Sequence, residues 1–569
     1  MPWFVSPRRI PSIFPLILLL ATVGCGGGGS SSSTEASDSP AEPEPRFSAT
    51  IRRTEYGIPH IEAEDWGSLG YGYGYAYAQD QFCMAMRGIA AATSRSAELL
   101  GEADGDPVTD FVLRFLFGDK DDFTANFQPD ADSDAHRLVE GFAFGMNRHL
   151  RETGVENLPD GDSGCRDAEW VHEIDATDLW MLIGRLPLKG GSDEGIVRRA
   201  IYNTEGPSLD NPFGIDGADQ DALIKGLSRL AKALRQPGQG SNALAVGRDL
   251  SQSGKGLLLG NPHRSWTGDG SFYQVHLTLP GEYDVAGAAL QGLPWVGIGF
   301  NSDLAWTHTT SFATRFTLYE LELNPLDLMQ YRYDGEWRDI TTEEVAIQVQ
   351  LEDGSLEERS HTFYRSHFGP IVNLKEISPL FGTWPLANGS VLALRDANSL
   401  RAEAFFEQYR RMGQAEDMDD FTDALKSIAT PVFHTLAADR DGEAFYGEVA
   451  AIPHVTQAQL DDCLTRIGRL LAGLANNAAL VLDGSDPDCE WGEDSDSPED
   501  SGLQAVTWDD GECPIADTLL VPSQSSDPDS PHFADQTELY SRKEWVRFPF
   551  CEADISAAQI GETVVVEEE

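Results

Sequence analysis

Basic residues are scarce in this 569-residue chain, where 41 Lys and Arg face 93 Asp and Glu and give a formal net charge of −52. Because recognition of nucleic-acid phosphates needs clustered Lys and Arg, this balance argues against a nucleic-acid partner. We interpret the acidity as a surface suited to a saline or exported setting rather than as an acidic binding surface. Hydrophobic residues still make up 41% of the chain, which is too many for a disordered protein and enough for a large core.

Cysteine is also scarce, with seven residues, and no two of them have the C-x-x-C spacing of a zinc site. Setting Cys25 aside leaves six, and an even number suggests disulfides in an exported protein. We expect Cys83 to pair with Cys165 and Cys463 with Cys489, although the connectivity does not follow from one sequence. We expect no metal site.

The N-terminus carries the one long apolar run, in "MPWFVSPRRIPSIFPLILLLATVGC". Two arginines, an apolar core and small residues form an export signal, and the run is too short for a comfortable span of ~20 residues. The ending "ATVGC" resembles the bacterial lipobox, which predicts a lipoprotein-type signal at 1–25 with lipid on Cys25; ordinary signal cleavage near that point is the alternative. The Gly/Ser/Pro-rich residues 26–46 then form a flexible tether. We expect an exported protein, periplasmic or anchored to a membrane.

Several common catalytic motifs are missing. The chain has no G-x-S-x-G elbow, no H-E-x-x-H and no G-x-x-x-x-G-K-[ST], and "GDSGC" at 161–165 is only a near miss. If the protein is a hydrolase, its nucleophile is therefore arranged in another way.

The pattern along the chain changes from helical to β. Residues 68–100 are mainly helical, and the glycines in "GYGYGYAYAQ" indicate close packing against a neighbouring element. A turn-rich run and an amphipathic helix at 222–235 precede residue 241, after which short β segments follow one another. Helices return near 401–428, before a strand pair in "TLAADRDGEAFYGEVA". This order predicts an α+β layered fold.

One hairpin brings a serine and a histidine together. "NALAVG" and "GLLLGN" flank the polar loop 248–256, whose centre is position 252. Ser241 and His263 each lie eleven residues from this centre, so an antiparallel register tends to make them neighbours. A serine beside a histidine at strand ends is a plausible hydrolytic site. Taken alone, such a meeting is more often incidental.

Several motifs in order strengthen this interpretation. "GSNALAVG", "GLLLGNPH", "LQGLPWVGIGFNSDLAWTHT" and "FTLYELEL" resemble the penicillin acylase family of N-terminal nucleophile hydrolases, as does the opening "YGIPHIEAEDWGSLGYGYGYAYAQDQF". "LAADRDG" and "SQSSDPDSPHFADQTELYSRKEW" most resemble the acyl-homoserine-lactone acylases in that family. The match covers about 47–492 and 519–554. It implies a four-layer αββα sandwich and no organic cofactor.

The resemblance also implies self-processing between Gly240 and Ser241. Residues 47–205 would be the α chain, 206–240 a spacer propeptide and 241–569 the β chain, so that one precursor supplies both chains. Ser241 would then be the nucleophile. Its own α-amino group, with an unperturbed pKa of about 7.7–8.0, would accept the proton through a water.

The same resemblance assigns further roles. The backbone N–H of Thr310 would stabilise the oxyanion, and His263 would orient the nucleophile or bind substrate. Arg264 and Trp295 would line the substrate pocket. Arg264 stands where the family has an aromatic residue, so either its side chain turns to solvent or the pocket takes shorter or acidic acyl groups. We expect no calcium, because no aspartate precedes Glu320 in "SFATRFTLYE".

One family segment is missing, and its absence separates two hypotheses. Only 32 positions separate Trp491 from Ser523, so the β chain is shortened between about 492 and 520, and the N-S-N-D-S-like motif that supplies a second oxyanion donor is absent. The first hypothesis is an exported amidohydrolase acting on N-acyl homoserine lactones, or on penicillin-type or other acyl amides. The alternative is an inactive, internally deleted homologue acting as a lipoprotein or binding scaffold. A plain secreted β-rich binding protein agrees less well with the ordered motifs.

Overall fold

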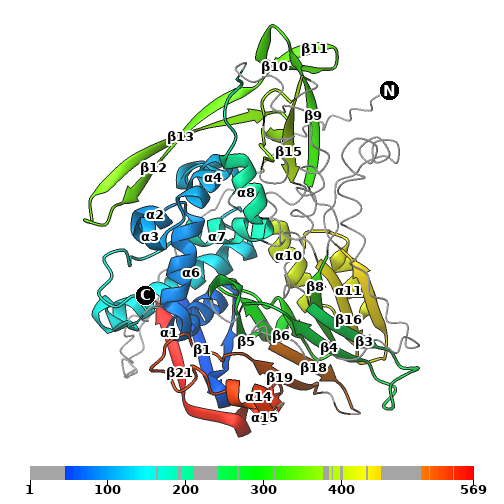
Figure 1. Ribbon diagram of the computed structural model, residues 1–569. Helices are drawn as coiled ribbons and strands as arrows, with labels where there is room; N and C mark the ends of the chain where they lie inside the picture. The colour runs from blue at the N-terminus through cyan, green and yellow to red at the C-terminus, as the bar shows by residue number, and fades with distance from the viewer. Residues whose placement is uncertain are drawn as a thin grey trace, which may run out of the picture. The chain divides into compact units, whose positions relative to one another are not determined.

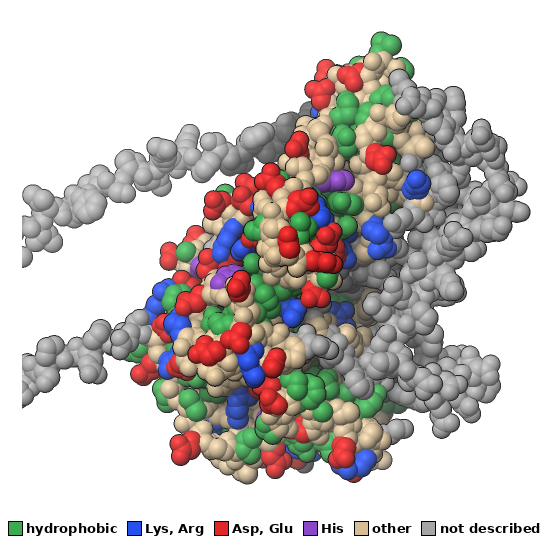
Figure 2. Space-filling view, turned by 60° about the vertical axis from the view of Figure 1, so that its left-hand side comes forward, with side chains coloured by type: hydrophobic (Ala, Val, Ile, Leu, Met, Phe, Trp, Pro, Cys, Tyr) green, Lys and Arg blue, Asp and Glu red, His purple; other side chains and the backbone are tan. Residues whose placement is uncertain are grey.

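A computed structural model describes residues 45–568, with gaps at 128, 162–163, 190–193, 209–240, 266–267, 312–315, 376–382, 387–388, 397–401, 431–432, 450–501, 510, 512 and 543. Pro45–Glu569 forms one compact unit. Within the described ranges, no helix is both long and apolar enough to cross a membrane. Figure 2 shows carboxylate side chains scattered over the described part of one face, with Lys and Arg among them.

A nine-stranded sheet forms the centre of the fold, in the order β17-β16-β8-β7-β6-β5-β2-β1-β21. Its neighbours are antiparallel except for the parallel pair β2–β5, and the C-terminal strand β21 lies beside the N-terminal strand β1 (Figure 1). The strands are β1 (Phe47–Thr54), β2 (Pro59–Ala63), β5 (Phe272–Leu279), β6 (Tyr283–Leu290), β7 (Ile298–Phe300), β8 (Leu304–Thr310), β16 (Phe433–Asp439), β17 (Ala444–Glu448) and β21 (Gln559–Glu568).

Helices cover one face of this sheet. They include α1 (Trp66–Ala92), α6 (Asp134–Thr153), α7 (Ala176–Lys189), α10 (Ala402–Gly413) and α11 (Met418–Leu425). Helices α1 and α6 approach so closely that a Cβ on Gly70 would lie 2.0 Å from the carbonyl oxygen of Leu138, and one on Gly74 would lie 2.1 Å from that of Phe142. Close packing is therefore the reason for the helix glycines, as predicted. The helices expected near 401–428 are also confirmed.

A second, five-stranded sheet packs on the other face, in the order β20-β19-β18-β4-β3. Its strands are β3 (Ser241–Val246), β4 (Leu257–Pro262), β18 (Gly502–Thr507), β19 (Ile515–Leu520) and β20 (Val546–Arg547). Leu258, Val506 and Ala516 meet Phe300 and Leu436 of the large sheet in a common core. Helices on one sheet and two sheets face to face confirm the α+β sandwich.

The remaining elements extend the sandwich at one end and along its sides. Sheets of four strands (β11-β10-β9-β15) and three strands (β12-β13-β14) lie against α4 and α8, where Phe115 stacks on Phe363 at 4.5 Å. These elements are β9 (Phe316–Asn324), β10 (Asp327–Tyr333), β11 (Glu336–Asp339), β12 (Thr341–Gln350), β13 (Leu356–Ser366), β14 (Gly369–Pro370), β15 (Ser390–Asp396), α2 (Ser96–Leu99), α3 (Gly101–Asp104), α4 (Pro107–Phe117), α5 (Lys120–Phe127), α8 (Glu194–Tyr202), α14 (Thr537–Arg542), α15 (Glu552–Ala558) and the short 3₁₀ turns Glu55–Gly57, Val155–Asn157 and Gly268–Gly270.

Two disulfides tie distant segments together. Cys83 of α1 is bonded to Cys165, with 5.4 Å between their Cα atoms, which is the first pair expected from the sequence. Cys513 is bonded to Cys551 across the end of the second sheet, a pairing that the sequence did not predict. Cys463 and Cys489 lie outside the described residues.

Candidate active site

Ser241 is the first residue of β3 and is half-buried. It pairs with Pro262 of β4, and the hairpin closes at Val246 and Leu257. The expected register, with Ser241 opposite His263, is therefore off by one residue. Ten residues form the connecting loop, an even number, so the ladder has its centre between two residues rather than on position 252.

His263 nevertheless contacts the serine, through its main chain. The backbone N–H of His263 donates a hydrogen bond of 3.3 Å to the Oγ of Ser241. The imidazole Nε2 lies 3.2 Å from the amide Nδ2 of Asn242. Asn242 therefore donates to the ring and orients it, a contact that the sequence did not indicate.

The packing of the two sheets places Ser241 near one end of β8. A Cβ on Gly256 would lie 2.4 Å from the carbonyl oxygen of Asp439, and one on Gly260 would lie 2.6 Å from the Oγ1 of Thr307. Gly256 therefore lies over the Leu304–Asp439 end of the β8–β16 ladder, and Gly260, four residues later, lies over its middle. Ser241 lies opposite Pro262, two residues further on, and so toward the end that carries Thr310.

Thr310 closes β8 at this end, opposite Phe433 of β16, and is half-buried. The structure therefore brings Ser241, His263 and Thr310 to the same end of the sandwich. Gly240 and Cys25 lie outside the described residues.

Further polar side chains gather at the same end and were not singled out from the sequence. His434 lies opposite Thr309 on one side and Glu448 on the other. The hydroxyl of Tyr446 lies 3.2 Å from the Nδ1 of His434, and the hydroxyl of Ser311 donates to the carboxylate of Glu448. The strand pair predicted in "TLAADRDGEAFYGEVA" was the signal in the sequence, because the register of an antiparallel hairpin puts residues 434 and 448 opposite each other.

His308, although adjacent, belongs to the opposite face. Its ring nitrogens lie 3.1 Å from the Oγ1 of Thr435 and 3.0 Å from the hydroxyl of Tyr409, on the helix side of the sheet. Burial lowers the pKa of His308 to about 4, so its imidazole is neutral at neutral pH. The described partners hold His308 as a structural histidine.

A small cavity of about 30 Å³ opens between the sheets beside Pro262. Its polar members are already bonded, since Gln274 donates to Thr518 at 2.8 Å and Gln504 to the carbonyl of Gly299 at 3.4 Å. The surroundings are otherwise apolar. The lining residues are Pro262, Phe272, Gln274, Gly287, Ala288, Ile298, Leu503, Gln504, Thr518, Leu519 and Leu520.

The two residues expected in the substrate pocket occupy different places. Arg264 lies two residues beyond the end of β4 and is half-buried, and burial lowers the pKa of its guanidinium. Trp295 is 2% exposed and meets the rings of Phe405 and Phe406 at 5.6 and 5.5 Å. The structure therefore places Trp295 in the core beneath α10 rather than in the cavity beside Pro262.

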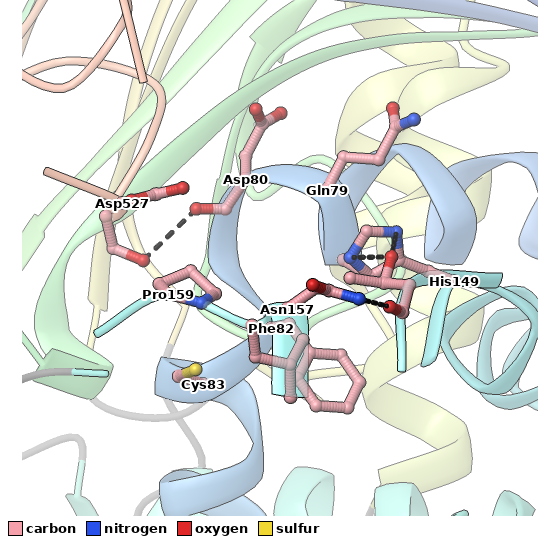
Figure 3. Close-up of a pocket in the computed structure, with 12 residues that line it drawn as sticks. Gln79, Asp80, Phe82, Cys83, His149, Asn157, Pro159 and Asp527 are labelled. Carbon is pink, nitrogen blue, oxygen red and sulfur yellow. Dashed lines mark hydrogen bonds between the residues drawn. The ribbon is translucent and has the colours of Figure 1, made fainter. Parts of the chain in front are cut away.

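A larger cavity of about 100 Å³ lies between α1, α6 and residues 526–527 (Figure 3). The carboxylate of Asp80 accepts hydrogen bonds from Arg53 at 2.9 Å and Tyr273 at 2.7 Å. His149 is held beside Thr153, and burial lowers its pKa to about 4. Because these groups already bind one another, the cavity offers a supporting network and none of the sequence-predicted catalytic residues.

The sequence is similar to those of known acylases. The chain matches the Penicillin amidase family over residues 48–502 and 499–557. Acyl-homoserine lactone acylase PvdQ of Pseudomonas syringae pv. tomato is 36% identical over 455 residues, which are 78% of this chain and 55% of the relative. Aculeacin-A acylase of Actinoplanes utahensis is 34% identical over 471 residues, or 79% and 56%.

A solved thermostable penicillin G acylase from Alcaligenes faecalis aligns with 58% of this chain and 100% of its own, at 13% identity and a TM-score of 0.41. The chain spans little more than half the length of the curated relatives that it matches.

Proposed function

The chain belongs to the penicillin amidase family, and from this premise we propose that it hydrolyses a linear acyl amide with Ser241 as nucleophile. The observation that carries the proposal is the geometry of Ser241. Its hydroxyl stands at the start of an edge strand, bonded to the backbone N–H of His263 and at the end of the sandwich that carries Thr310. The motifs of the resemblance and the position of Ser241 in the stacked sheets both support this proposal.

Activation requires a break in the chain. Hydrolysis of the peptide bond between Gly240 and Ser241 leaves a carboxylate on Gly240 and a free α-amino group on Ser241. That amine titrates near ambient pH and accepts the hydroxyl proton through a water. One residue then supplies both nucleophile and base, as in other N-terminal nucleophiles.

The catalytic cycle needs no external reactant except water. The Oγ of Ser241 attacks the amide carbonyl, and the backbone N–H of Thr310 donates to the developing oxyanion. The C–N bond then breaks, and the amine leaves with the proton that the α-amino group held. Water attacks the resulting ester, releases the carboxylic acid and returns the proton to Ser241.

The cavity beside Pro262 is the candidate acyl pocket. Phe272, Ile298 and Leu520 form an apolar core at its wall, and Pro262 lies directly opposite the nucleophile. A cavity of about 30 Å³ holds only a small group. We therefore propose N-acyl homoserine lactones with short acyl groups as the first substrate class, and other acyl amides, including those of the penicillin type, as the second.

Export belongs to the proposal as well. The signal expected at 1–25 and lipid on Cys25 would keep the enzyme in the periplasm or at a membrane. The alternative, an inactive scaffold, draws on the short stretch between Trp491 and Ser523, on the missing N-S-N-D-S-like motif, and on the short length of the chain beside its relatives.

Intact mass after denaturing separation tests the proposal. The wild-type chain is expected to give two polypeptides, one beginning at Ser241, and Ser241→Ala is expected to stay whole. Ser253→Ala, at an exposed serine in the loop of the same hairpin, is the matched control and is expected to cleave like wild type. A folded wild-type chain that stays whole and releases no acid from short acyl amides would leave the scaffold as the better description.

A further inference from the structure

The Nε2 of His434, on the strand next to β8, makes no hydrogen bond to any described residue. His434 is 8% exposed, and its Nδ1 lies 3.2 Å from the hydroxyl of Tyr446. Its Nε2 is buried and has no hydrogen-bond partner among the described residues. A buried polar atom without a hydrogen-bond partner costs free energy, because it loses its hydrogen bonds to water and gains none in the protein. Such an atom in a native structure often has a function.

Strand alternation fixes the face on which His434 lies. Leu436 and Ala438, two and four residues further along β16, belong to the core between the two sheets. Thr435 points the other way and contacts His308 on the helix side. His434 therefore faces the second sheet, where β3 carries Ser241.

The stacking of the sheets then places His434 at the Ser241 end. Gly256 lies against Asp439 at one end of β16, and Gly260 lies against Thr307, whose partner on β16 is Leu436. Continuing two residues in the same direction leads to Pro262 and Ser241 on one sheet, and to Thr309 of β8 on the other; His434 of β16 is the ladder partner of Thr309. Strand β3 packs against both β16 and β17.

The strand order separates two sides of the site. The cavity beside Pro262 is lined by β5, β6 and β7, on one side of β8. His434 and Tyr446 belong to β16 and β17, on the other side of β8. An amide whose carbonyl lies over the end of β8, with its acyl group in the cavity, therefore extends its amine half toward His434.

We propose that His434 and Tyr446 form the subsite for the amine half of the substrate, and this proposal rests on the proposed function above. In the tautomer that this subsite uses, the hydroxyl of Tyr446 donates to Nδ1, and Nε2 carries the proton and donates to an acceptor on the substrate. Glu448, opposite His434, disfavours an anionic amine half. The acceptor is thus a neutral oxygen, such as a lactone or ester carbonyl.

The position of Tyr446 agrees with this assignment. Its side chain is 61% exposed, at the β17 edge of the large sheet. The released amine therefore has a short way to solvent while the acyl group stays between the sheets.

A pair of amides with one acyl group tests the subsite. One carries homoserine lactone as its amine half, and the other carries cyclopentylamine, which has the ring but lacks the carbonyl. His434→Leu is expected to lower kcat/KM for the lactone amide by about tenfold and to change the cyclopentyl amide by less than about threefold. His434→Gln keeps a hydrogen-bond donor and is expected to recover part of the preference for the lactone amide, measured as the ratio of the two kcat/KM values.

The outcomes separate the two proposals. Equal losses on both substrates, or no loss on either, overturn the subsite while the hydrolysis itself upholds the enzyme. If the wild-type chain cleaves neither amide and stays unprocessed, the proposed function fails, and the subsite fails with it.

Discussion

The backbone N–H of His263 donates to the Oγ of Ser241 at 3.3 Å, although Ser241 pairs with Pro262 across the hairpin. The nucleophile is therefore positioned by main chain, and the imidazole of His263 is held separately, by Asn242 at 3.2 Å. This division has a consequence for mutagenesis, because a side-chain truncation at 263 leaves the bond to the nucleophile in place.

The first prediction concerns coupling between Asn242 and His263. We expect Asn242→Ala and His263→Ala each to lower kcat/KM by roughly tenfold, and the double variant to be little worse than either, because both remove the same bond. Chain processing should persist in all three, since the His263 N–H remains. The measurement is a double-mutant cycle on kcat/KM; additive losses would mean that the ring and the amide act independently.

The second prediction concerns the close approach of the sheets at Gly260. A Cβ there would lie 2.6 Å from the Oγ1 of Thr307, so Gly260→Ala is expected to lower the free energy of unfolding by about 1–3 kcal/mol. Gly297→Ala is the control, because its Cβ would come no nearer than 3.8 Å to its neighbours. Urea unfolding measures both. Adding Thr307→Ala to Gly260→Ala should recover part of the loss, and no recovery would show that the strain lies elsewhere.

The third prediction concerns acid stability and His149. Burial lowers the pKa of His149 from 6.5 to about 4, so the folded state disfavours its protonation. The stabilisation from its neutral form is present above pH 6.5 and is lost as the pH falls toward 4. His149→Gln should therefore flatten the fall in melting temperature over this range. His172→Gln, at an exposed histidine, should leave the slope as in wild type; a similar flattening in both variants would contradict the assignment.

The fourth prediction ranks the two disulfides. The Cys83–Cys165 bond spans 82 positions and the Cys513–Cys551 bond spans 38, so the first closes the longer loop in the unfolded chain. On loop entropy alone, replacing both cysteines of a bond by serine costs about 4.5 kcal/mol for Cys83–Cys165 and about 4 kcal/mol for Cys513–Cys551. Chemical unfolding of the two double variants checks the order. The reverse order would mean that native-state packing, rather than loop length, decides.

Much of the fold could be predicted because its signals are local. The glycines within α1 indicated close packing, and α6 meets them at Leu138 and Phe142. The alternating strands around Ser241 predicted the hairpin, and motif order indicated the family. Each of these depends on residues near one another in the chain, where period and spacing carry the information.

The register of the site was missed by one residue for a physical reason. The sequence shows a polar loop, but whether its turn centre falls on a residue or between two depends on how the loop closes. Closing at Val246 and Leu257 moved the partner of Ser241 from His263 to Pro262. His263 still contacts Ser241, but through its backbone N–H, which donates to the serine Oγ, and not as the cross-strand partner.

Pattern and motif order thus sufficed for the class of fold, the family and the identity of the candidate nucleophile, since all three are written in short stretches of chain. The surroundings of that nucleophile depend on how two sheets stack. Thr307 meets Gly260, His434 turns toward β3, and Trp295 lies in the core beneath α10, because these segments are separated along the chain and become neighbours only after the sandwich closes. Such contacts between layers have no period along the chain, and only the packed structure reveals them.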